Sequence, residues 1–79
     1  MKKLETHQEL EGQSILMIIE FVDKHGARDI LYLTVNRKGI YKVYRQWNTL
    51  EKITFWGIKK KTRNEALKRI FTKITTQLL

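Results

Sequence analysis

The chain has 79 residues, enough for one compact domain, and 42% of them are hydrophobic, including two Trp, three Tyr and three Phe. It contains no cysteine, which excludes disulfides and thiolate zinc sites and fits a reducing, cytoplasmic compartment. The net charge of +8 is unevenly distributed: residues 1–35 carry four basic and six acidic groups, a net of −2, whereas residues 36–79 carry twelve basic and two acidic groups, a net of +10. This asymmetry favours a polyanionic partner.

The first twelve residues have little to bury. Only Leu4 and Leu10 are sizeable apolar side chains beyond Met1, so we expect a weakly ordered segment over residues 1–12 and a single domain over residues 13–79. The acidic residues near the N-terminus are not typical of a signal peptide, and the longest apolar run, residues 15–19, is too short to cross a bilayer. We therefore expect neither secretion nor membrane contact.

The first predicted strand begins at Gln13 and runs through residues 15–22, which are apolar except for Glu20. We expect it to be largely buried on both faces, with Glu20 on the wetter side. Polar residues and a glycine over residues 23–29 predict a loop of hairpin length. Residues 53–58 alternate well enough to predict a further strand after a loop.

A tight hairpin is predicted between these strands. Asn36 is first and Gly39 fourth in the sequence N-R-K-G, as a type I turn with a following left-handed residue requires. That turn fixes the register and assigns one set of cross-strand pairs to the core and the other to an exposed face. The core pairs are Val35–Tyr41, Leu33–Val43 and Leu31–Arg45, and the exposed pairs are Thr34–Lys42 and Tyr32–Tyr44.

A C-terminal helix is indicated by an apolar stripe with a 3.6-residue period, formed by Leu67, Ile70, Phe71, Ile74 and Leu78. Thr62 and Glu65 have the spacing of a capping box at its start. The predicted fold is therefore α+β, with a three- to four-stranded antiparallel sheet and one C-terminal amphipathic helix packed across it.

Three basic clusters are candidates for phosphate contact. Arg37 to Arg45 interleaves cations with tyrosine on the hairpin, Lys59 to Arg63 precedes the predicted helix, where backbone amides bind anions, and two cations lie on the outer helix face. The candidate nucleic-acid contacts are Arg37, Lys38, Lys42, Tyr44, Arg45, Lys59, Lys60, Lys61, Arg63, Arg69 and Lys73. The alternatives are that the lysines keep a small protein soluble and blunt a sheet edge, that the tyrosines pack across strands, and that the helix face is simply solvated.

Other site classes have weaker support. We expect Trp47 and Trp56 to belong to the core or its edge, because so small a domain needs their area. His7 and His25 have no cysteine or paired carboxylates near them in the sequence, and the four glycines are scattered singly, so we expect no enzyme, no metal site and no cofactor.

The small sheet joined to one helix by the T-x-x-E-A start at Thr62 to Ala66 resembles the sheet-reading DNA-binding domains of some integrases. It also resembles the last half of double-stranded-RNA-binding domains. This likeness spans one junction and does not choose between DNA and RNA.

We expect a basic nucleic-acid-binding accessory or regulatory protein, such as one from a mobile element, with DNA favoured over RNA as the partner. The alternative is a protein-interaction module, an inhibitor or adaptor that docks on an acidic protein or forms a homodimer through its sheet. The apolar strand over residues 15–22 motivates that alternative.

Overall fold

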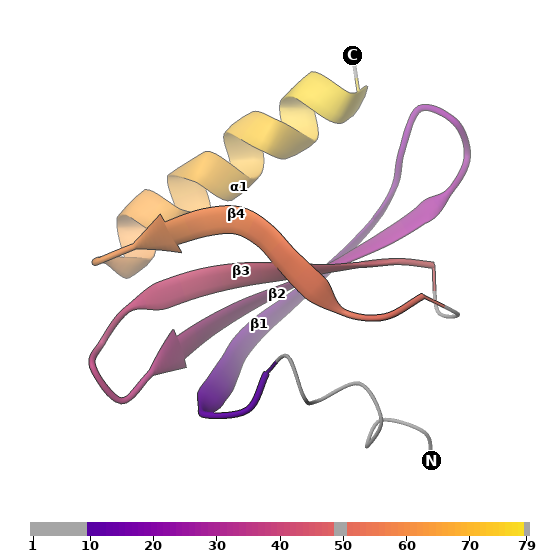
Figure 1. Ribbon diagram of the computed structural model, residues 1–79. Helices are drawn as coiled ribbons and strands as arrows, with labels where there is room; N and C mark the ends of the chain where they lie inside the picture. Colours follow the sequence, from indigo (N-terminus) through magenta and orange to yellow (C-terminus); the bar gives the residue numbers. More distant parts are fainter. Residues whose placement is uncertain (1–9, 49–50, 79) are drawn as a thin grey trace.

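The computed structural model describes residues 10–48 and 51–78. It contains a four-stranded antiparallel sheet in the order β1-β2-β3-β4 and one helix, α1, beside β3 and β4 (Figure 1). The elements are β1 Gln13–Val22, β2 Arg28–Asn36, β3 Tyr41–Trp47, β4 Thr54–Lys60 and α1 Arg63–Leu78. The predicted α+β architecture is confirmed. Residues 1–9, most of the segment expected to be weakly ordered, lie outside the described residues.

The β2–β3 hairpin has the predicted turn and register. The Gly39 amide donates to the Asn36 carbonyl oxygen at 3.0 Å, and Asn36 Oδ1 accepts hydrogen bonds from the amides of Lys38 and Ile40. Gly39 has a φ of +80°, a left-handed conformation that a glycine adopts without strain. All five predicted cross-strand pairs are present, because the turn leaves the strands no other register.

The β1–β2 turn repeats this arrangement one hairpin earlier. The Gly26 amide donates to the Asp23 carbonyl oxygen at 3.0 Å, and Asp23 Oδ1 accepts from the amides of His25 and Ala27 at 2.9 Å. The hydrogen bond from the Ala27 amide lowers the pKa of the Asp23 carboxyl. Desolvation opposes this shift, and the amide and charge of His25 add to it. The predicted loop over residues 23–29 is therefore too long, since β2 already begins at Arg28.

The main core lies between α1 and the sheet. Ala66 and Ile70 of α1 are buried against Leu31 and Leu33 of β2, Val43 of β3 and Ile58 of β4, with Leu67 and Ile74 packed at the margin. The predicted stripe is wrong at Phe71, which is 57% exposed, because Phe71 lies about 100° around the helix from Ile70. Ala66, one turn before Ile70, takes its place. The Leu78 side chain lies outside the described part of the chain.

The other face of the sheet carries a second, smaller core. Leu10, Tyr44 and Ile53 are buried together there, and Tyr32 packs against them. The prediction that this face is exposed is wrong for Tyr44 and for Thr34, both of which are buried. The segments that precede β1 and β4 cover this face, and Leu10 shows that the packed region begins before residue 13.

Candidate nucleic-acid interface

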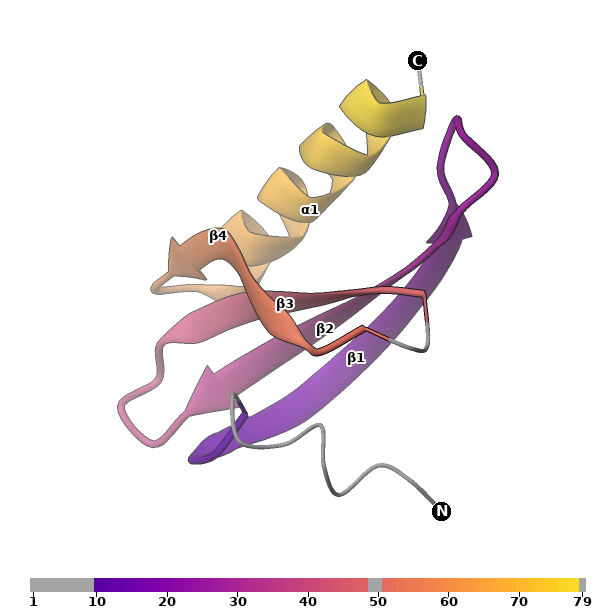
Figure 2. The same ribbon diagram turned by 45° about the vertical axis from the view of Figure 1, so that its right-hand side comes forward.

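One end of the sheet gathers most of the predicted contacts. Tyr41 at the start of β3 pairs with Lys60 at the end of β4, so the β2–β3 turn, the end of β4 and the start of α1 share one end of the molecule (left in Figure 1; Figure 2). Two of the three basic clusters therefore meet. We call this region the basic end, and it comprises Arg37, Lys38, Lys42, Lys59, Lys60, Lys61 and Arg63.

Two lysines of the basic end lie directly opposite each other on neighbouring strands. Lys42 of β3 pairs with Lys59 of β4. The side chain of Ile58 is buried under α1, so strand alternation places Lys59 and its partner Lys42 on the face away from the helix. Like charges directly opposite in an antiparallel sheet are destabilising, so this pair does not stabilise the fold.

The cations of the basic end have no acidic partners within the described residues. The only ion pair among residues 10–48 and 51–78 joins Arg45 to Asp29, and neither belongs to the basic end. Glu65 is the nearest acidic residue in sequence, and its carboxylate accepts a hydrogen bond from the Thr62 hydroxyl at 3.2 Å. The basic end therefore presents positive charge that no described carboxylate neutralises through an ion pair.

The start of α1 is capped from within the chain. The Thr62 hydroxyl accepts a hydrogen bond from the Glu65 amide at 3.2 Å, and the Thr62 carbonyl oxygen accepts one from the Ala66 amide. The predicted capping box is confirmed, although the Glu65 side chain contacts the Thr62 hydroxyl and not its amide. The Ala66 bond is the first bond within the helix, so the cap occupies one first-turn amide, that of Glu65.

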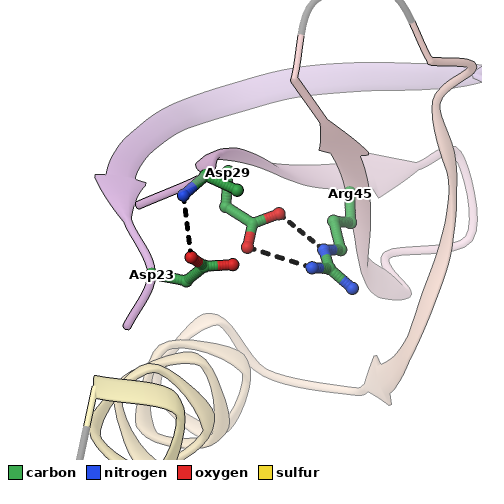
Figure 3. Close-up of polar contacts among 4 residues, drawn as sticks. Asp23, Asp29 and Arg45 are labelled. Carbon is green, nitrogen blue, oxygen red and sulfur yellow. Dashed lines mark hydrogen bonds and ion pairs between the residues drawn. The ribbon is translucent and has the colours of Figure 1, made fainter. Parts of the chain in front are cut away.

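Arg45 has a structural role away from the basic end. Its Nε donates to Asp29 Oδ1 at 2.6 Å and its Nη2 to Asp29 Oδ2 at 3.0 Å, the forked geometry of a bidentate pair (Figure 3). The Asp29 side chain is fully buried, while that of Arg45 is 29% exposed. A buried carboxylate needs such a partner, so this guanidinium is committed to the fold.

The remaining candidates do not join the basic end. Tyr44 is buried and meets Phe55 edge to face at 5.8 Å between ring centroids, so its ring is not available to stack on a base. Lys73 Nζ lies 4.8 Å from the Trp56 ring centroid and 3.3 Å from its carbonyl oxygen. Arg69 is exposed farther along α1 and lines a shallow hollow with Trp56 and Lys73.

The two tryptophans have different environments. Trp56 packs against the main core as predicted. Trp47 is 48% exposed and belongs to neither core cluster, so the prediction that it lies in the core or at its edge is wrong. Trp47 lines an open cleft of about 470 Å³ at the far end of the sheet, together with His25 and Arg45. Sequence patterns give no signal for this cleft, because strand pairing brings its walls together from separate hairpins.

Asn64 is an exposed polar residue that the charge pattern does not identify. This residue is exposed between Arg63 and Glu65 at the start of α1, where an amide side chain can bind phosphate oxygens. Its only sequence signal is its place beside the lysine run.

No described group of His, Cys, Asp or Glu side chains is arranged to hold a metal ion. Within the described residues, α1 is neither long nor apolar enough to span a bilayer. Comparison of the chain with protein-family models, curated proteins and solved structures gives no significant match. A functional assignment therefore depends on the geometry and charge of this chain alone.

Proposed function

We propose that this protein binds nucleic acid through the basic end, in an accessory or regulatory role. The observation that carries the proposal is the Lys42–Lys59 pair, two like charges placed opposite each other where an ion pair would be stabilising. A phosphate between the two ammonium groups would turn this repulsion into attraction. The neighbouring turn and strand–helix junction extend the positive surface on both sides.

Duplex DNA is the form of nucleic acid that we favour. Proteins that bind single strands stack bases on exposed aromatic rings. At the basic end Tyr41 packs against the main core, and Tyr44 is buried on the other face. Contact with the phosphates of a duplex needs only the exposed cations. The expected binding is therefore largely independent of base sequence.

The test is a fluorescence anisotropy titration of labelled duplex DNA, duplex RNA and single-stranded DNA at low salt. The variant K42E/K59E replaces one like-charged pair with another, so its folding stability should stay near that of the wild type. Its control, K24E/K52E, makes the same change in net charge at two exposed lysines of the far end. We expect the first variant to lose about tenfold or more in affinity for duplex DNA and the control to lose far less.

Two results would count against the proposal. If the wild type binds none of the three nucleic acids at low salt, the proposed function is wrong. Equal losses in the two variants would show that net charge, and not the basic end, determines binding.

A further inference from the structure

The two edges of the sheet differ in how they resist pairing with another strand. At the β4 edge, Gly57 has a φ of +87° and Trp56 and Gly57 interrupt the pairing with β3. Lys73 Nζ contacts the Trp56 carbonyl oxygen, and Lys59 and Lys60 end the strand. Bulges and lysines are the devices by which proteins prevent edge-to-edge association.

The β1 edge has few of these devices. β1 is ten residues long, Glu20 is its only charged residue, and it contains neither proline nor lysine. Its pairing with β2 is irregular only at Leu16 and is continuous from Met17 to Val22. No described residue pairs with its outer edge.

Apolar side chains lie exposed along the same edge. The prediction that this strand is largely buried on both faces is therefore wrong, because α1 packs mainly against β3 and β4. Ile18 and Val22 are each 57% exposed, and Ile15 and Leu16 are 39% and 48% exposed. A long, regular, apolar edge of this kind is a template for another strand.

We propose that β1 pairs antiparallel with β1 of a second copy of this chain, joining two sheets into one of eight strands. A strand edge is complementary to itself under two-fold symmetry. Charge favours this occupant, because β1 is the only described strand without Lys or Arg and two copies of a +8 chain would repel through most other surfaces. The antiparallel arrangement places the two basic ends at diagonally opposite corners of the dimer.

The register determines how much of β1 would be paired. A ten-residue strand is about 33 Å long. Two-fold pairing centred on Ile19 would join residues 16–22 of the two copies, about 23 Å of that length. The pairing requires no nucleic acid and is independent of the function proposed above.

The charge pattern selects one register. Two-fold pairing places residues of the same sheet face opposite each other, so the axis passes through a residue of β1. An axis at Glu20 would oppose the two Glu20 carboxylates, and one at Ile18 would bring the Leu16 irregularity into the centre. An axis at Ile19 avoids both. It sets Met17 opposite Phe21 and Ile18 opposite Glu20 of the second copy.

This register makes opposite predictions for two substitutions at one exposed site. I18E places like charges opposite each other twice in the dimer, whereas I18K places a lysine opposite each Glu20. We expect I18E to raise the dissociation constant of the dimer about tenfold or more. I18K should remain dimeric, and I18E/E20K should restore pairing. The control T54E adds the same charge at an exposed position of β4 and should have no effect.

The measurement is sedimentation velocity of the full chain without nucleic acid over a concentration series up to about 100 µM, from which the dissociation constants of the wild type and each variant are compared; a dimer of micromolar affinity is almost fully formed at the highest concentration. Circular dichroism verifies that each variant is folded. A wild type that is monomeric at about 100 µM overturns the proposal. That result is expected if residues 1–9 or another protein, and not a second copy of the chain, covers β1. A dimer insensitive to I18E, or broken equally by I18E and I18K, overturns it too.

Discussion

Replacing Arg45 by methionine should strongly destabilise the protein. Methionine keeps the length and apolar stem of the side chain but removes both hydrogen bonds to Asp29. The Asp29 carboxylate is fully buried, so the variant leaves a buried charge without its partner. Breaking a buried ion pair in this way typically destabilises a protein by 3–5 kcal/mol.

The expected loss lies at the lower end of that range, about 3 kcal/mol, because the Arg45 side chain is 29% exposed and water can approach the site from its side. Domains of this size have free energies of unfolding of about 4–12 kcal/mol. The midpoint of thermal unfolding should therefore fall by about 12–24 °C. Urea denaturation followed by tryptophan fluorescence measures the free energy of unfolding. Thermal unfolding followed by circular dichroism measures the midpoint temperature.

The double variant D29L/R45M is the control for this prediction. It removes both charges, so no buried carboxylate is left unpaired, and its stability should return to within about 1 kcal/mol of the wild type. At temperatures where R45M is folded, its affinity for duplex DNA should stay within about twofold of the wild type, because Arg45 lies outside the basic end. A stability loss below about 1 kcal/mol would refute the structural role of Arg45. A large loss of affinity in the folded variant would contradict its exclusion from the DNA-binding surface.

Three further substitutions test other parts of the fold. L10A should lower the free energy of unfolding by about 2–3 kcal/mol, because Leu10 fills the second core; an unchanged urea midpoint would show that this core contributes nothing. G39A should lower it by about 1 kcal/mol through strain at positive φ, and a stabilised variant would contradict the turn geometry. Because the pKa of the Asp23 carboxyl is lower in the folded state, its contribution to stability is present above about pH 4 and disappears as the pH falls through the folded-state pKa. D23N keeps the acceptor oxygen without this titration, so urea midpoints from pH 5 to pH 2 should fall less than in the wild type, and identical pH profiles would contradict the assignment.

The sheet topology and the hairpin register could be predicted because they depend on local signals. The turn residues Asn36 and Gly39 restrict the backbone to one geometry, and alternation along the strands does the rest. The first hairpin has the same turn signal, with aspartate (Asp23) in the first position in place of asparagine and glycine (Gly26) in the fourth. The helix start could likewise be predicted from Thr62 and Glu65, since a capping box is a contact between residues three apart.

The exposure of individual residues could not be predicted in the same way. Tyr44 is buried because two segments distant in sequence, represented by Leu10 and Ile53, cover the second sheet face. Phe71 is exposed because α1 packs on its Ala66 side. Such choices depend on tertiary packing, which a periodic pattern does not specify.

The candidate site was predictable where it depends on local sequence and not where it depends on contacts between strands. Charge runs identify cations, and the hairpin and strand–helix junction place seven of them at one end once β3 and β4 are paired. Arg45 was indistinguishable from them in sequence, because its partner Asp29 comes from another strand.

The salt dependence of DNA binding tests the central claim most directly. Binding constants for duplex DNA, measured by anisotropy over a series of salt concentrations, give a logarithmic slope of about −0.9 for each phosphate neutralised. If all seven cations of the basic end contact phosphates, the wild-type slope should approach about −6, and K42E/K59E should reduce its magnitude by about 2 or more, whereas K24E/K52E should leave it nearly unchanged. Equal slopes for the wild type and K42E/K59E would show that the basic end does not contact the DNA backbone.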